Sequence, residues 1–221
     1  MKKGISPQEA ADLIPDGAVL MIGGFMGVGS PHRIIEALVE AGRKDLTVIA
    51  NDTGRPNYGI GRLIRVGAVK KLIASHIGLN PETQKGMIDG VIEVDLIPQG
   101  TLAERIRCGG YGLGGVLTKT GLGTIAAKGH RVIDIDGEDW LYTPPLRADF
   151  ALLHADRADF VGNLVYQLTA TNFNPVMATA GATVIAEPRE ILPVGMITPD
   201  SVNTPGVLVN YIIRRNIPNG A

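Results

Sequence analysis

The chain has 221 residues, of which 45% are hydrophobic and 19% are charged, and its formal net charge is −1. This near-neutral balance provides no basic surface for nucleic acid or for an anionic membrane, and every apolar run is far shorter than the ~20 residues that span a bilayer. The single cysteine, Cys108, cannot form an internal disulfide, which is typical of reduced, cytoplasmic proteins. We therefore expect one cytoplasmic domain over residues 1–221, without nucleic-acid or membrane partners.

The first segment of the chain predicts a helix followed by a buried strand. Residues 6–9, SPQE, fit a capping box with proline in the first helical turn. Residues 18–22 are five consecutive apolar residues, which is typical of a strand buried on both faces. The strand ends at Gly23-Gly24, and Ser30-Pro31 predicts a second helix, with the serine as N-cap and the proline as the first helical residue.

Strands and helices alternate along most of the remaining chain. Further strands are predicted at residues 46–50, 72–75, 91–97, 131–135, 150–154 and 182–186, and helices at 31–41, 81–89, 101–107 and from 174 onward. This pattern indicates an α/β fold with an open, mostly parallel sheet and helices on both faces. Residues 109–129 are glycine-rich and lack a periodic core pattern, so we expect a long loop that is functional or mobile.

The loop from Gly24 to Ser30 is the first candidate site. It follows a predicted strand at the sheet edge where open α/β proteins bind ligands, and the next helix would offer free backbone N–H groups to an anion. A side chain at Gly24 or Gly29 is expected to crowd the ligand while leaving the fold intact. The spacing fits neither the dinucleotide fingerprint nor the P-loop, and an ordinary glycine turn between strand and helix is the alternative.

Several motifs together resemble the family I coenzyme A transferases. The first signature is the run DGAVLMIGGFMGVGSP, at residues 16–31. Further runs resemble the alpha subunit of the short-chain acyl and 3-oxoacid enzymes, namely NDT at 51–53, SHIG and NPET within 75–83, PQGTL at 98–102, and the glycines 109–110 leading to 118–124. The resemblance covers nearly the whole chain, and it implies a modified, mostly parallel open α/β sheet.

The resemblance also implies a mechanism and a partner. In the family, a glutamate carboxylate attacks the thioester of an acyl-CoA, and CoA is then carried as a glutamyl thioester in a ping-pong reaction. That glutamate lies in a motif of the Ser-Glu-Asn-Gly type, which this chain lacks. We therefore expect no catalytic nucleophile here and a beta subunit that supplies it, in a heterodimer or an α2β2 heterotetramer. CoA is expected as a substrate, with no permanently bound cofactor.

The resemblance and the chemistry of the side chains together select the site residues. By resemblance the CoA-linked loop comprises Gly24, Phe25, Met26, Gly27, Val28, Gly29 and Ser30. Gln99, at the end of a predicted strand, is a neutral amide that can donate to a developing oxyanion. Asn51 is a candidate for the same role, for the same reason. For both amides, a purely structural role in ordering a loop or turn is the alternative. The four histidines and one cysteine show no metal-ligand spacing, so no metal site is expected.

Three functions remain open from the sequence. The main one is CoA transfer between an acyl-CoA and a carboxylate of the acetate, acetoacetate or butyrate class. The alternatives are a sugar-phosphate isomerase-like enzyme, which would need acid-base residues within one chain, and a non-catalytic ligand-sensing module of the same fold. A Gly-x-Gly-x-x-Ala match at residues 121–126 follows no buried strand, so we expect no nucleotide there.

Overall fold

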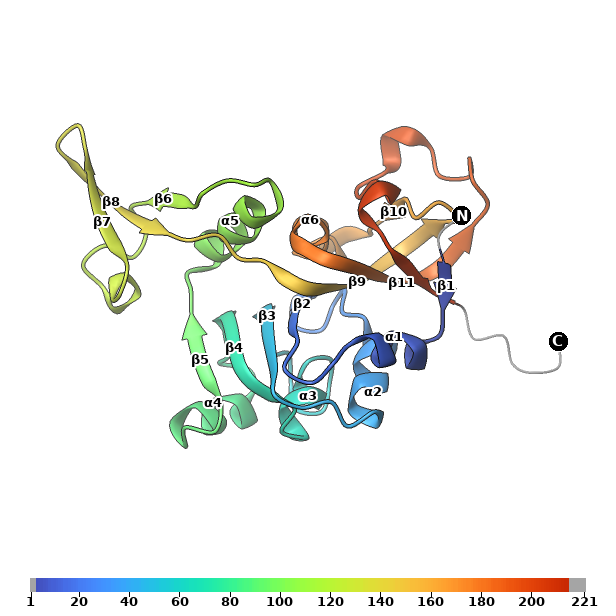
Figure 1. Ribbon diagram of the computed structural model, residues 1–221, viewed down its shortest axis with the longest axis horizontal. Coiled ribbons are helices and arrows are strands. Elements are labelled where there is room, and N and C mark those ends of the chain that lie inside the picture. The colour runs from blue at the N-terminus through green and yellow to red at the C-terminus, as the bar shows by residue number, and fades with distance from the viewer. Residues whose placement is uncertain (1–2, 215–221) are drawn as a thin grey trace.

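The computed structural model describes residues 3–214, which form a large sheet, a smaller sheet and six α-helices (Figure 1). The nine-stranded main sheet has the order β1-β12-β11-β9-β2-β3-β4-β5, and β10 pairs with β9. All neighbours are parallel except the β9-β10 pair. Its strands are β1 (Lys3–Ile5), β2 (Val19–Ile22), β3 (Leu46–Asp52), β4 (Val69–His76), β5 (Glu93–Leu96), β9 (Ala148–Asp159), β10 (Leu164–Val165), β11 (Gly181–Leu192) and β12 (Tyr211–Ile213).

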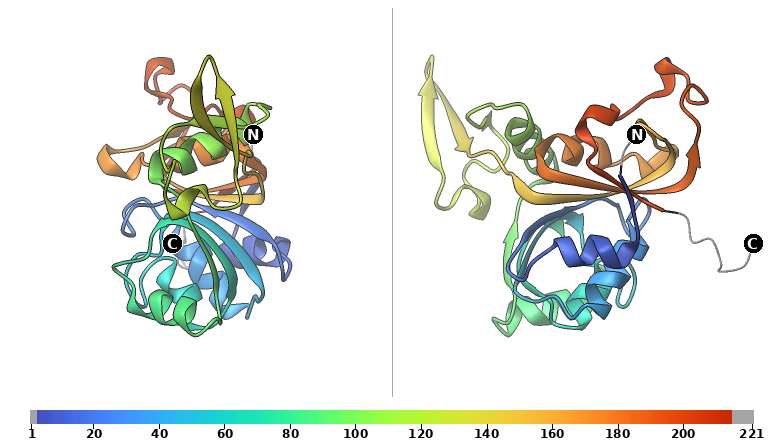
Figure 2. Two further views of the ribbon diagram at one scale, coloured as in Figure 1. Left: turned by 90° about the vertical axis from the view of Figure 1, so that its left-hand side faces the viewer. Right: turned by 45° about the vertical axis from the view of Figure 1, so that its right-hand side comes forward.

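Helices cover both faces of the main sheet, as the alternating pattern predicted. The helices are α1 (Pro7–Leu13), α2 (His32–Glu40), α3 (Gly61–Arg65), α4 (Pro81–Ile88), α5 (Gln99–Gly110) and α6 (Asn174–Ala180). Helices α1 to α4 lie on one side of the sheet, and α5 and α6 lie on the other (Figures 1 and 2). In β2, Leu20 and Ile22 pack into the core on the first side and Met21 packs into the core on the second. Burial on both faces explains why this strand is an uninterrupted apolar run.

The order of the strands places a topological switch point beside β2. From β2 the chain moves outward through β3 and β4 to β5, whereas from β9 it moves in the opposite direction to β11 and β12. The switch point therefore lies between β2 and β9, and the glycine loop leaves the sheet at the carboxyl end of β2. In open α/β sheets, ligands bind in the crevice at such a point.

A second, smaller sheet projects from the side of the molecule near α5 (Figure 1). It contains β6 (Val116–Thr118), β8 (Glu138–Thr143) and β7 (Arg131–Ile135) in that order, all antiparallel. The prediction of one continuous loop over residues 109–129 was therefore wrong in part. That segment holds the end of α5, strand β6 and a short 3-10 helix, Ile125–Ala127. A three-residue strand has too few alternating positions to be recognised, and its partner strand is distant in the chain.

The predicted capping box of α1 is confirmed, and a side chain also caps α4. Ser6 Oγ accepts a hydrogen bond from the Glu9 N–H at 3.0 Å, and Glu9 Oε2 accepts one from the Ser6 N–H at 2.7 Å. The Asn80 side chain caps α4 by accepting from the Glu82 N–H at 3.1 Å. The capping box depends on residues within three positions of each other, which is why the sequence alone reveals it.

The predicted cap of α2 was wrong. This helix begins at His32 with Pro31 in the N-cap position, and Ser30 does not cap it. Instead, the carboxylate of Glu187 on β11 accepts from the N–H groups of Arg33 at 3.1 Å and Ile34 at 2.9 Å. The expected anion site at the start of α2 is therefore already occupied by the protein's own carboxylate.

Candidate active site

The glycine loop after β2 is a tight hairpin. Phe25 and Val28 exchange two backbone hydrogen bonds of 2.9 Å. Between them, Met26 and Gly27 have φ angles of 52° and 85°, the two positive values that a type I′ turn requires. Phe25 and Val28 are 41% and 49% exposed. The loop thus presents an aromatic ring and a rigid backbone turn at the switch point.

The tip of the hairpin is held by side chains from β3 and α2. Asp52, at the end of β3, is 5% exposed, and its Oδ2 accepts from the Met26 N–H at 2.9 Å. His32 Nε2 lies 3.2 Å from the carbonyl oxygen of Gly27. Burial lowers the pKa of His32, which favours the neutral ring. The tip is therefore anchored to the main sheet on one side and to a helix on the other.

The two limbs of the hairpin are held by asparagines from the start of α6 and from the segment before it. Asn172 contacts both limbs, through Gly24 and Val28, and Asn174 contacts Gly29. The sequence identified Asn174 only as the start of a helix, and it did not single out Asn172. About 145 residues separate these asparagines from the loop, so no local pattern signals the contacts.

Most of the backbone donors of the loop are used by the protein itself. The N–H groups of Gly24, Phe25, Met26 and Val28 all bond to protein acceptors. Among residues 3–214, the N–H groups of Gly27 and Gly29 have no hydrogen-bond partner. Gly27 is buried and Gly29 is half-buried, so the Gly29 amide is the more accessible donor that the loop can offer to an oxyanion or a carbonyl oxygen.

The glycines of the loop are required by the packing of the protein. A Cβ atom on Gly24 would lie 2.0 Å from Ser30 Oγ, and one on Gly29 would lie 2.7 Å from the carbonyl oxygen of Ala170. Both residues also have positive φ angles, of 129° and 77°. The expectation that a side chain there would crowd only a ligand and spare the fold is therefore wrong, because it would first collide with the chain itself.

Gln99 and Asn51, the two amides selected from the sequence, are in direct contact. Gln99 is the first residue of α5, and its Nε2 donates to Asn51 Oδ1 at 2.6 Å. Asn51 is 1% exposed and donates through Nδ2 to Asp52 Oδ2 at 2.7 Å. A chain of hydrogen bonds therefore connects exposed Gln99 through Asn51 and Asp52 to the amide of Met26. Since Asn51 is buried, it can orient Gln99 but does not face a ligand directly.

A cavity of about 300 Å³ lies beside Gln99 and the loop. Its lining residues are Phe25, Gln99, Ala103, Asn172, Phe173 and Val176. The wall is mostly apolar, with two amide side chains in it. Both Nδ2 hydrogens of Asn172 donate to backbone carbonyls, whereas Gln99 Nε2 donates only one hydrogen, to Asn51. The cavity therefore suits a small acyl group whose carbonyl accepts from the second Nε2 hydrogen of Gln99.

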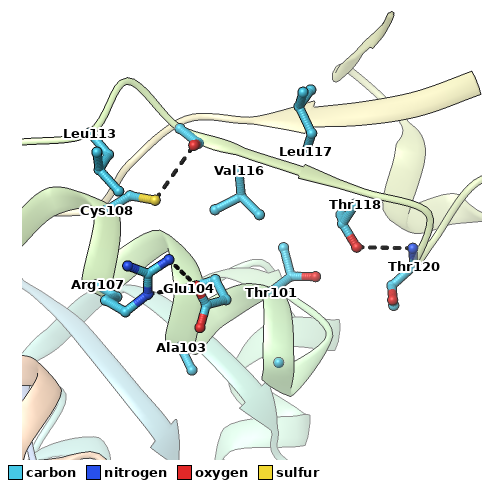
Figure 3. A pocket seen from close by; sticks show the side chains of 12 residues that line it. Thr101, Ala103, Glu104, Arg107, Cys108, Leu113, Val116, Leu117, Thr118 and Thr120 are labelled. Atoms are coloured by element: carbon cyan, nitrogen blue, oxygen red, sulfur yellow. Dashed lines mark hydrogen bonds and ion pairs between the residues drawn. The ribbon is translucent and has the colours of Figure 1, made fainter. Parts of the chain in front are cut away.

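A larger cavity of about 630 Å³ lies between α5 and β6, and it shares Ala103 with the first (Figure 3). Arg107 and Glu104 form an ion pair at its rim, with N···O distances of 2.6 and 2.7 Å. Cys108 is buried, and its Sγ points to the carbonyl of Gly115 (Figure 3). The two cavities together follow α5 away from the glycine loop.

Buried carboxylates in the described residues serve the protein's own backbone. Asp52, Asp159 and Glu187 are buried, and each accepts hydrogen bonds from main-chain N–H groups. A carboxylate in such bonds is a poor free nucleophile, because its lone pairs are occupied. Within residues 3–214, no group of three or more His, Cys, Asp or Glu side chains could hold a metal ion. No helix in the same range is long and apolar enough to cross a membrane.

Comparisons with known proteins identify the family. Residues 5–215 match the family model described as coenzyme A transferase. The chain is 53% identical over 206 residues to the acetate CoA-transferase subunit alpha of Escherichia coli (strain K12), covering 93% of this chain and 94% of that relative. It is 51% identical over 199 residues to the acetoacetyl-CoA:acetate/butyrate CoA transferase alpha subunit of Clostridium acetobutylicum, covering 90% and 91% of the two chains.

Solved structures show the same fold at lower identity. An acyl-CoA transferase from Escherichia coli O157:H7, in a thioester complex with CoA, has a TM-score of 0.85 and 23% identity, and it covers all of this chain. The present chain spans 49% of that neighbour's length. Glutaconate coenzyme A-transferase from Acidaminococcus fermentans has a TM-score of 0.84 and 19% identity over 96% of this chain and 75% of its own. The chain belongs to the coenzyme A transferase family.

Proposed function

We propose that this chain is the alpha subunit of a short-chain acyl or 3-oxoacid CoA-transferase, which moves CoA between an acyl-CoA and a carboxylate such as acetate, acetoacetate or butyrate. The relatives that are at least half identical are named as alpha subunits of such enzymes. The relatives support this function, and they do not support the isomerase-like or ligand-sensing alternatives. The observation that carries the proposal is the exposed amide of Gln99 beside the glycine loop and its cavity.

The proposed first half-reaction begins with a glutamate carboxylate of the beta subunit. Its oxygen attacks the thioester carbon of the acyl-CoA, and the carbonyl oxygen becomes an oxyanion. The unpaired amides of Gly27 and Gly29 and the second Nε2 hydrogen of Gln99 stabilise that charge. The carbon-sulfur bond then breaks, and CoA leaves as a thiolate from a mixed anhydride.

The second step transfers CoA to the enzyme. The thiolate attacks the glutamyl carbonyl of the anhydride, the acyl group leaves as a free carboxylate, and a glutamyl-CoA thioester remains. An acceptor carboxylate then reverses both steps, which gives ping-pong kinetics. The apolar wall formed by Phe25, Phe173 and Val176 limits the access of water to the anhydride and the thioester, which would otherwise hydrolyse.

The proposed assembly follows because the groups that the reaction needs lie on two different chains. This chain supplies the loop, Gln99 and the cavity wall, and a beta subunit supplies the nucleophile, in a heterodimer or an α2β2 heterotetramer. CoA takes part as a substrate, and no permanently bound cofactor is proposed. A cytoplasmic location remains a prediction from the sequence.

The test is CoA transfer by this chain with and without a beta subunit that carries the Ser-Glu-Asn-Gly motif. Acetoacetyl-CoA and butyryl-CoA are the donors and acetate is the acceptor. We expect transfer only with both chains, and intact mass spectrometry after donor addition should place the covalent CoA on the beta subunit. Transfer by this chain alone, or a CoA adduct on it, would refute the assignment of the nucleophile to the partner.

A further inference from the structure

We propose that Asn172 is a positioning residue for the transfer reaction, which acts by orienting the peptide group that contains the Gly29 amide. The inference rests on the proposed function, because it takes the glycine loop as the source of oxyanion donors. Asn172 lies on the segment before α6, and its side chain reaches across to the hairpin that follows β2.

The side-chain amide of Asn172 uses both of its atoms to join the two limbs of the hairpin. Its Oδ1 accepts from the Gly24 N–H at 3.1 Å, on the limb that enters the turn. Its Nδ2 donates to the carbonyl oxygen of Val28 at 3.0 Å, on the limb that leaves it. The remaining capacity is also used, because Oδ1 accepts from the Phe173 N–H at 2.7 Å and Nδ2 donates to the Thr169 carbonyl at 2.8 Å. Asn174 Nδ2 also donates to Oδ1, at 3.5 Å. An amide with five partners has one favourable orientation.

The contact with Val28 has a consequence for Gly29. The carbonyl of Val28 and the N–H of Gly29 belong to one planar peptide unit, in which the two bonds point in opposite directions. The Val28 carbonyl also accepts from the Phe25 N–H at 2.9 Å, so Asn172 is the second of two donors that fix it. Together they fix the direction of the Gly29 N–H, away from Asn172. That N–H is one of the two unpaired amides of the loop within residues 3–214.

Asn174 has a different task from Asn172, although it contacts the same loop. It is fully buried, donates to the Gly29 carbonyl at 2.9 Å and accepts from the His154 N–H at 3.1 Å. A Cβ on Gly23 would lie 1.9 Å from its Oδ1, so it also fills the space beside that glycine. Asn174 therefore supports the base of the loop. Asn172 is only half-buried and borders the cavity with Gln99, so it can be replaced without removing core packing.

The test compares two Asn172 variants with a matched control in the complex with the beta subunit. Asn172→Asp keeps the acceptor for the Gly24 N–H but loses both donors and places a carboxylate oxygen against the Val28 carbonyl. Asn172→Ala loses all the hydrogen bonds of the side-chain amide, as both donor and acceptor. Asn163→Ala is the control, because Asn163 is also half-buried, accepts from the Gly206 N–H at 2.8 Å and donates to Asp159 at 2.8 Å, on a different turn.

We expect kcat to fall by about tenfold or more in both Asn172 variants, with little change in KM. This fall is smaller than the loss in kcat when an oxyanion donor is removed outright. Amide hydrogen exchange across residues 24–30 should become faster. Asn163→Ala should lose a similar amount of thermal stability without either effect.

Two outcomes would overturn the proposal in different ways. An active wild-type complex whose Asn172 variants keep kcat, or lose it only as far as Asn163→Ala does, refutes the positioning role and leaves the proposed function in place. A wild-type complex that transfers no CoA refutes the proposed function, and the positioning role with it.

Discussion

Gln99 Nε2 donates a hydrogen bond of 2.6 Å to Asn51 Oδ1, although 48 residues separate them in the chain. The same Asn51 oxygen accepts from Ser75 Oγ at 2.9 Å. Gln99 is exposed, whereas Asn51 is buried at the end of β3. A buried amide that is held from two sides thus orients an exposed amide beside the glycine loop and its cavity.

The first prediction concerns this pair. Gln99→Ala should lower kcat by about 10²-fold or more with little change in KM, because an oxyanion donor acts mainly in the transition state. Ser75→Ala is the control, since it removes the other donor to Asn51 and leaves Gln99 in place; its effect on kcat should be far smaller. Steady-state kinetics of the complex with the beta subunit measure both. Equal losses in the two variants would mean that the network only supports the fold.

The second prediction concerns stability at Gly24. Gly24→Ala should lower the free energy of unfolding by about 1–3 kcal/mol through overpacking against Ser30, in addition to about 1–2 kcal/mol from the positive φ angle. Gly17→Ala is the control, because Gly17 has a φ of 78° but no atom within 4 Å of a Cβ there. Denaturant unfolding of both variants separates the two costs. A loss at Gly24 no larger than at Gly17 would contradict the predicted collision.

The third prediction concerns the carboxylate that caps α2. Glu187→Ala should lower the free energy of unfolding by about 1–3 kcal/mol, because it leaves the N–H groups of Arg33 and Ile34 without this acceptor. Burial raises the pKa of Glu187, so part of this loss is offset by removing a charge that is costly to bury.

The matched control for that prediction is Glu190→Ala on the same strand. Glu190 is exposed, so its replacement should change the unfolding free energy by no more than about 0.5 kcal/mol. Thermal and denaturant unfolding give both values. If the two variants are equally stable, the contacts of Glu187 with α2 contribute nothing to stability.

The fourth prediction concerns pH and His154. Burial lowers the pKa of His154, the charges of His32 and Arg189 lower it further, and Asp156 opposes them. A histidine with a lower pKa in the folded chain binds fewer protons there than in the unfolded chain. Its contribution to stability is therefore present above about pH 6.5, the ordinary pKa of histidine, and is lost as the pH falls toward the folded pKa.

We therefore expect the chain to lose stability between about pH 7 and about pH 5, and His154→Gln to lose less over the same range. The pKa of His32 is also lowered by burial, so replacing both histidines should flatten the dependence further. Unfolding midpoints across the pH series measure this. A steeper loss in His154→Gln than in the wild type would reverse the sign and refute the argument.

The local signals in the sequence were reliable where neighbouring residues decide the structure. The capping box at Ser6 is present, because it depends on contacts over a few positions. The predicted Ser30 cap is absent, because Glu187 accepts from the first N–H groups of α2 instead. The buried strands were also found, but β9 and β11 have 12 residues each, far more than the apolar cores that revealed them. Both strands carry charged residues toward their carboxyl ends, so a search for runs of buried apolar residues finds only part of each strand.

By itself, the sequence determined the α/β fold and the position of the glycine loop, and it selected Gln99 and Asn51 as candidates, because periodicity, turn residues and family motifs are properties of short runs. Only the tertiary structure decided how that loop is held. Asn172 and Glu187 reach their partners across 148 and 153 residues. Those contacts exist because β9 and β11 pack side by side and β9 lies against β2, and strand pairing over such distances depends on the whole fold.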